Sequence, residues 1–144
     1  MKIAAITAIV SALFMGFALK GLNFFHLIKW NPVGFYKKTV LFNESSGLFK
    51  WFFLIIILFC IAMIMYLVMQ YAYFVPAAVT SFLIGFVLTI TLEWYVLDLP
   101  LQVSSFKKLS IPFMVTVICL LRFIIQTAVY HKQEQLAHRE IVDV

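Results

Sequence analysis

Charged residues are scarce in this sequence. Only 12% of its 144 residues are Asp, Glu, Lys or Arg, six of them acidic, whereas 65% are hydrophobic. A soluble domain typically carries about 25% charged and about 45–50% apolar residues. A soluble fold of this composition would lack the polar surface that keeps it in solution. We therefore expect an integral membrane protein whose main partner is the lipid bilayer.

Catalytic and metal-binding motifs are also missing. The sequence holds no H-E-x-x-H, no G-x-S-x-G and no Walker loop, and its two cysteines, Cys60 and Cys119, do not form a C-x-x-C pair. Its three histidines lie outside the long apolar runs, which argues against a haem held by histidine within the membrane. We therefore expect no enzyme activity, no cofactor and no metal. Both cysteines fall in apolar runs and are interpreted as small buried residues.

The net charge of +5 does not indicate a nucleic-acid partner. There is no separate basic domain, and the lysines lie at the edges of apolar runs, where they suit anionic lipid headgroups. Most of them fall in residues 20–50 and 98–108. The tendency of cytoplasmic loops to be basic predicts that both loops are cytoplasmic and both termini are outside. Lys2 and the free amino group favour the opposite orientation.

The apolar runs predict an all-α fold. The longest, residues 51–97, would measure about 70 Å as one helix, more than twice the hydrocarbon thickness of about 30 Å, so it must fold back. Pro76 marks the turn. We predict a four-helix transmembrane bundle in one domain, 1–144, with a basic aromatic interfacial loop over 20–50. The predicted helices cover about 3–19, 51–71, 77–97 and 109–130, and a polar tail covers 131–144.

The first apolar run supports two interpretations. The first is a signal peptide cleaved near residue 18. Its basic start would be Lys2, its apolar core would follow, and its cleavage site would be Gly16-Phe17-Ala18. The alternative is a spanning helix, because small residues recur every four positions and would let two helix backbones approach closely. We expect this small stripe to pack against 77–97, where small residues share one face too, or else to mediate homodimerisation. The residues are Ala4, Ala8, Ala12 and Gly16, facing Ser81, Gly85 and Thr89.

The 20–50 loop combines lysines with bulky aromatic residues, which is typical of a segment in the headgroup layer. Asn31-Pro32 interrupts any helix there. Asn43-Glu44-Ser45 matches the N-glycosylation acceptor, a pattern that is frequent by chance. The aromatic residues are Phe24, Phe25, Trp30, Phe35 and Tyr36, and the lysines are Lys20, Lys29, Lys37, Lys38 and Lys50.

Polar residues within the spans are the candidate functional residues. Glu93 continues the face of Ser81, Gly85 and Thr89, and Arg122 shares a face with Cys119, Gln126 and Tyr130. A central arginine costs about 2.5–3.5 kcal/mol on insertion scales, so Arg122 should face protein or water. Three interpretations remain open: a structural network of Glu93, Arg122, Gln126 and Thr89, a site for an anionic ligand or a proton, or an interface with another membrane protein.

Four short segments carry a resemblance to a known family: Asn23-Phe24, Lys50-Trp51, Asp98-Leu99-Pro100 and Thr116-Val117-Ile118-Cys119-Leu120. With them the chain resembles the YqhR-type membrane proteins of spore-forming Gram-positive bacteria, a family with no assigned biochemistry. The resemblance implies a bacterial plasma membrane. The chain departs from the family pattern at Arg122 and Gln126, where a small polar run is expected.

Three functions are compatible with this pattern. The first is a non-enzymatic regulatory or accessory subunit that acts through lateral helix contacts with a membrane-protein partner. The second is a small homo-oligomeric transporter or channel subunit that uses Arg122 and Glu93. The third is a membrane enzyme, which is disfavoured because no nucleophile and base are recognisable.

Overall fold

The computed structural model describes residues 1–32, 46–98, 100 and 103–144. These residues form four long α-helices and one short 3-10 helix, η3 (Val103–Lys108), and each long helix is apolar enough to cross a membrane. The protein is thus an all-α, multi-pass membrane protein built as a four-helix bundle, as predicted. The long helices are α1 (Lys2–Phe24), α2 (Gly47–Tyr71), α3 (Ala77–Leu97) and α4 (Ile111–Val142).

The predicted and observed helix boundaries agree closely near the prolines. They differ where the prediction ended a helix at a charged residue. The chain turns at residues 72–76, and Pro76 is the N-cap of α3. Ser110 is the N-cap of α4, with Pro112 in its first turn. In contrast, α1 continues past Lys20 to Phe24, because one lysine can extend its charge to the interface without ending a helix.

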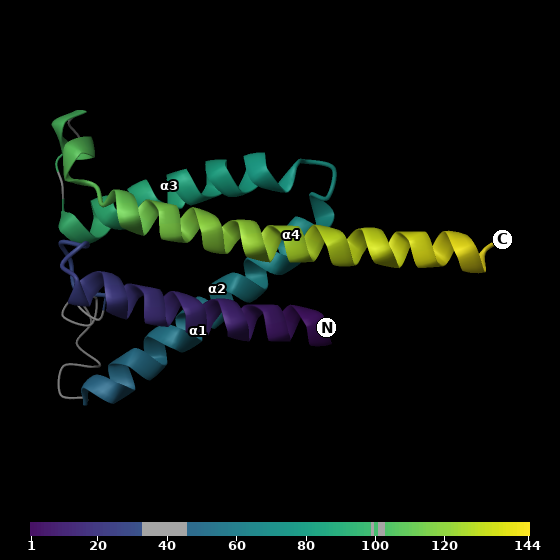
Figure 1. Cartoon of the computed structure of the whole chain (residues 1–144), viewed down its shortest axis with the longest axis horizontal. Helices are drawn as coiled ribbons and strands as arrows, with labels where there is room; N and C mark the ends of the chain where they lie inside the picture. Colours follow the sequence, from purple (N-terminus) through teal and green to yellow (C-terminus); the bar gives the residue numbers. More distant parts are fainter. Residues whose placement is uncertain (33–45, 99, 101–102) are drawn as a thin grey trace.

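The polar tail is the clearest difference in secondary structure. Residues 131–142 continue α4 as an unbroken helix, whereas we predicted a helix that ends at 130 and a polar tail after it. Eight of these twelve residues are Lys, Gln, Glu, Leu, Ala or Arg, which are strong helix formers. At 1.5 Å per residue α4 is about 48 Å long, so its C-terminal third extends beyond a core of about 30 Å. Figure 1 shows this end projecting past the other helices.

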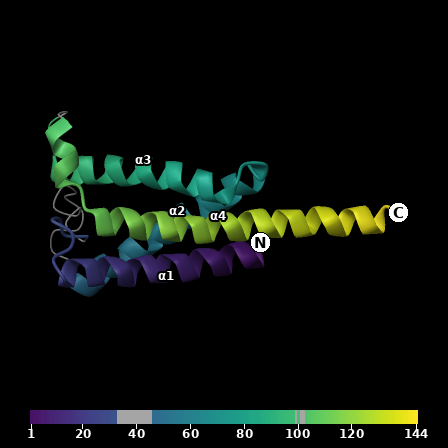
Figure 2. The same ribbon diagram turned by 45° about the horizontal axis from the view of Figure 1, so that its top comes forward.

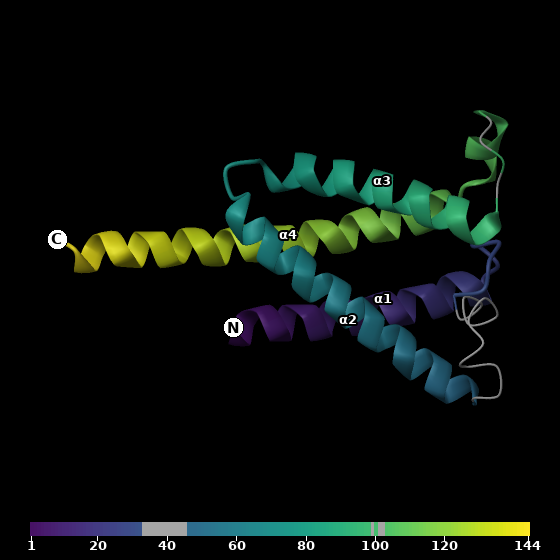
Figure 3. The same cartoon turned by 180° about the vertical axis from the view of Figure 1, so that it is seen from behind.

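The helices are arranged as a layer with a crossing helix behind it. In Figures 1 and 2, α4 lies between α1 and α3, and Figure 3 shows α2 running diagonally across the opposite side. Accordingly, α4 packs against all three other helices, and α1 packs against α2 and α4. Because α2 covers only one side of this layer, none of the described helices lies over the side of α4 that faces away from α2.

The small stripe of α1 packs against different helices from those we predicted. Its four residues are buried, but α1 has no extensive contact with α3 and instead packs on α2 and α4. Gly16, for example, faces the Ile55 side chain of α2. The small residues of α3 pack on α4. The sequence therefore identified the packing faces correctly and paired them incorrectly.

α3 and α4 approach each other closely at Gly85. A Cβ atom added there would lie 2.7 Å from Cγ1 and 3.2 Å from Cα of Ile118. The second contact is with backbone, so a rotation of the Ile118 side chain would not relieve it. The two helices can lie this close only because residue 85 has no side chain.

We predict that Gly85→Ala destabilises the bundle by about 1–3 kcal/mol, because the added methyl group forces α3 and α4 apart. Unfolding of the purified protein in mixed micelles by increasing SDS measures the change. Gly21→Ala is the matched control, since nothing lies within 4 Å of a Cβ at that position. Equal stability of the two variants would contradict the close contact.

Candidate functional site

A buried carboxylate joins the ends of three segments at the loop side of the bundle. Glu93, near the C-terminal end of α3, is only 1% exposed. Its Oε2 accepts a hydrogen bond from the backbone N–H of Ser110 at 2.8 Å, and its Oε1 accepts one from the indole Nε1 of Trp30 at 3.4 Å. The Lys29 ammonium is close enough to interact electrostatically with the carboxylate. Glu93 thus contacts the chain before α4 and the chain after α1.

The position of Glu93 follows from the polarity of a helix end. The first N–H groups of a helix have no partner within it, and the helix dipole places partial positive charge there. Ser110 is the N-cap of α4, but its side chain does not cap the helix. Its hydroxyl instead donates to the carbonyl of Leu27 at 2.7 Å. The carboxylate of α3 therefore satisfies the start of α4, and Ser110 ties that start to the segment after α1.

Trp30, from the predicted basic aromatic loop over 20–50, packs against the end of the bundle. Its ring is half-buried and meets Phe113 edge to face, with centroids 5.1 Å apart and an interplanar angle of 89°. Ile28 is buried beside it. The remaining predictions for this loop, at Phe35, Tyr36, Lys37, Lys38 and the Asn43-Glu44-Ser45 acceptor, lie outside the described residues.

The structure does not bring Glu93 and Arg122 together. Glu93 lies level with Ser110, which precedes Arg122 by about 18 Å along α4 at 1.5 Å per residue. Arg122 and Gln126 are exposed. Thr89 does not bridge them, since its hydroxyl donates to the Gly85 carbonyl of its own helix at 2.7 Å. The four residues predicted as one network are two buried residues of α3 and two exposed residues of α4.

Arg122 belongs to a surface that we call the outer face of α4. Its members share the side of the helix opposite to the buried residues Val117, Leu121 and Ile125, and all are exposed. Among the described residues Arg122 makes no ion pair or hydrogen bond. The outer face comprises Val115, Cys119, Arg122, Phe123, Gln126 and Tyr130.

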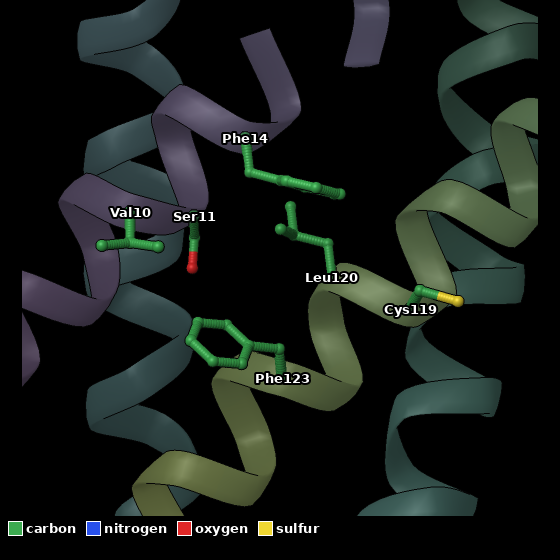
Figure 4. Close-up of a pocket in the computed structure, with 6 residues that line it drawn as sticks. All are labelled: Val10, Ser11, Phe14, Cys119, Leu120 and Phe123. Atoms are coloured by element: carbon green, nitrogen blue, oxygen red, sulfur yellow. The ribbon is translucent and has the colours of Figure 1, made fainter. Parts of the chain in front are cut away.

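A groove runs along one edge of this outer face, between α1 and α4. It has a volume of about 290 Å³, and Figure 4 shows its lining side chains. The Ser11 hydroxyl oxygen is fully buried and, among the described residues, has no hydrogen-bond partner. The lining residues are Val10, Ser11, Phe14, Cys119, Leu120 and Phe123.

Both cysteines were interpreted as buried, and both are exposed. Cys119 belongs to the outer face of α4, and Cys60 lies on the surface of α2. A cysteine in an apolar run can be buried in protein or face lipid, and hydrophobicity alone does not separate the two environments. Among the described residues no three His, Cys, Asp or Glu side chains are placed to hold a metal ion.

A second polar cluster lies at the other end of the bundle. The Nδ1 atom of His131 is 3.0 Å from the Tyr66 hydroxyl and 3.3 Å from the Gln70 amide nitrogen. The Nε2 atom of the same ring is 3.2 Å from the Gln135 amide nitrogen, so His131 meets polar side chains of α2 and of its own helix through both ring nitrogens. The sequence placed His131 on a solvated tail. It is instead half-buried where α4 leaves the bundle, whereas His138 is exposed as expected.

Sequence reasoning missed Trp30, Ser110, Tyr66 and His131 as interacting residues. One signal was available for Ser110, because a serine two residues before a proline at the start of an apolar run is typical of an N-cap. The other three residues form two contacts, Trp30 with Glu93 and Tyr66 with His131, which join residues more than 60 positions apart and have no local pattern.

Comparison of the chain with protein-family models, curated proteins and solved structures finds no match. The resemblance to YqhR-type proteins therefore stays a prediction, and the site has to be interpreted from its own geometry.

We predict that Glu93→Ala destabilises the bundle by about 1–3 kcal/mol, because it leaves the buried N–H of Ser110 without an acceptor. Glu93→Gln should cost less, since the amide oxygen can still accept one bond. Unfolding in mixed micelles compares both variants with Glu134→Ala, which removes an exposed glutamate from the projecting part of α4. A Glu93→Ala variant as stable as Glu134→Ala would show that the buried carboxylate does not hold the helix ends together.

Tyr66→Phe should lower stability by about 1 kcal/mol, because it removes the hydroxyl that bonds His131 while keeping the buried ring. The control is Tyr71→Phe, at a side chain that is 82% exposed. The same SDS titration provides the measurement. If the two substitutions have equal effects, the contact between α2 and α4 at His131 contributes nothing.

Proposed function

We propose that this four-helix membrane protein is a non-enzymatic accessory subunit that acts by lateral contact with a partner membrane protein through the outer face of α4. The observation that carries the proposal is the environment of Arg122. The section of α4 from Ile111 to His131 is about 30 Å long, which matches the hydrocarbon core, and Arg122 lies near its middle.

The energetics of a central arginine support a contact outside this chain. Its insertion costs about 2.5–3.5 kcal/mol, and such residues normally face a bundle interior, a water-filled cavity or a partner. Arg122 is exposed, and the described residues offset none of this cost. A neighbouring protein that covers the outer face would offset it. The openness of this side of α4, opposite the crossing helix α2, is consistent with such a neighbour.

The geometry favours this role over that of a transporter or channel subunit built on Arg122 and Glu93. Glu93 is closed in by Ser110 and Trp30, whereas Arg122 lies on the outside of the bundle. The two charges therefore do not line a common path within one copy of the chain. An enzyme is disfavoured for the reason already given, because no nucleophile and base are recognisable in the sequence.

The setting that we propose is a bacterial plasma membrane. The lysines near α1, α2 and η3 favour a cytoplasmic position for loops 20–50 and 98–108. The projecting end of α4 would then lie on the outer side, together with the N-terminus of α1.

A photo-crosslinking amino acid at Val115 or Phe123, on the outer face of α4, should capture one discrete membrane protein in native membranes. Ile64 of α2, which is 60% exposed, is the control position and should yield only lipid adducts. Gel electrophoresis and mass spectrometry identify the products. Lipid adducts alone at Val115 and Phe123, as at Ile64, would contradict the proposed function.

A further inference from the structure

We infer that the partner of the outer face of α4 presents a transmembrane helix with a carboxylate side chain at the depth of Arg122. The inference rests on the proposed function and adds the chemistry of the partner. A guanidinium group carries five N–H donors and pairs most strongly with a carboxylate, which can accept two of them in parallel. In a medium of low dielectric constant the attraction between the two charges is stronger. Either charge buried without the other is destabilising.

The depth of Arg122 argues against a lipid phosphate as the normal counter-charge. Arg122 is about 16 Å along α4 from Ile111, at the loop side, and about 13 Å from His131, at the other side. An arginine side chain spans only part of either distance. A headgroup would have to be drawn into the hydrocarbon layer, which requires local thinning of the bilayer. A carboxylate on a second helix is delivered at the required depth without that deformation.

The same depth argues against a second copy of this chain. Copies inserted in the same orientation have their residues at equal depths, and a two-fold interface brings equivalent residues together. Pairing of two outer faces would therefore place two Arg122 guanidinium groups close together within the membrane. The described residues of the outer face include no Asp or Glu to separate these like charges. The partner is thus expected to be a different chain.

The groove between α1 and α4 gives the partner a second contact. Cys119 and Phe123 line the groove and also flank Arg122 on the outer face. A helix that lies along the outer face would therefore be able to place an apolar side chain in the groove while its carboxylate meets Arg122. Helix packing of this kind, with side chains of one helix between those of another, is how helices associate in membranes.

A model transmembrane peptide tests the inference directly. The probe is a leucine-rich spanning peptide with one central Asp, compared with otherwise identical peptides that carry Asn, Lys or Leu at that position. The full chain, labelled at the end of α4, is reconstituted with each peptide in phosphatidylcholine vesicles. Fluorescence energy transfer measures their association. We expect the Asp peptide to bind about tenfold more tightly than the Leu peptide, a typical scale for one strong interhelical contact.

Two variants identify the arginine responsible. Arg122→Leu should remove the preference for the Asp peptide and leave the fold intact, because Arg122 makes no ion pair or hydrogen bond with the described residues. Arg139→Leu removes an arginine from the projecting end of the same helix and should leave the preference unchanged. Equal binding of the Asp and Leu peptides to the unmodified protein, or a preference that survives Arg122→Leu, would overturn the inference.

Three further outcomes bear on the inference separately from the proposed function. A preference for Asp that disappears when phosphatidylglycerol is added would assign Arg122 to anionic lipid and overturn the inference. A protein captured from Val115 whose spans contain no Asp or Glu would also overturn it, while the proposed lateral contact would stand. Capture of a second copy of this chain from Val115 would likewise overturn the inference that the partner is a different chain.

Discussion

The hydrogen bond between the Glu93 carboxylate and the backbone N–H of Ser110 is the contact on which the arrangement of helices depends most. It fixes where α4 begins relative to α3, and Ser110 in turn holds the carbonyl of Leu27. Once α4 begins there, its length places Arg122 near the middle of the apolar section from Ile111 to His131 and brings His131 to the level of Tyr66. A carboxylate at a helix N-terminus is electrostatically favourable, which explains how this acidic residue is accommodated in an apolar span.

Hydrophobicity predicted the secondary structure of this protein well and its tertiary contacts poorly. The spans follow from length and composition, because a helix is required wherever backbone groups are removed from water. The turn at 72–76 follows from Pro76, and the buried faces of α1 and α3 follow from small residues at a spacing of four. Which faces meet does not follow. The stripe of α1 fits α2 and α4 as well as it would fit α3, since small residues permit a close approach without selecting a partner.

The same limit applies to the candidate site. Sequence spacing correctly placed Glu93 with Thr89 and Arg122 with Gln126, but spacing within one helix does not give the level of one helix relative to another. It therefore did not separate the two charges. Nothing in the sequence indicated that the segment after α1 folds over the end of the bundle, where Trp30 reaches Glu93. That contact depends on the three-dimensional path of the connecting segment, and the path has no local signature.

The unbroken course of α4 has a mechanical consequence. After Pro112 the helix contains neither proline nor glycine, the residues at which helices usually bend. From Arg122 to Val142 it is a rod of about 30 Å, so a tilt of about 10° at the level of Arg122 would displace its far end by about 5 Å. A change in what lies against α4 at Arg122 would thus move the end of the helix that projects past the bundle, where Glu134, His138 and Arg139 are exposed.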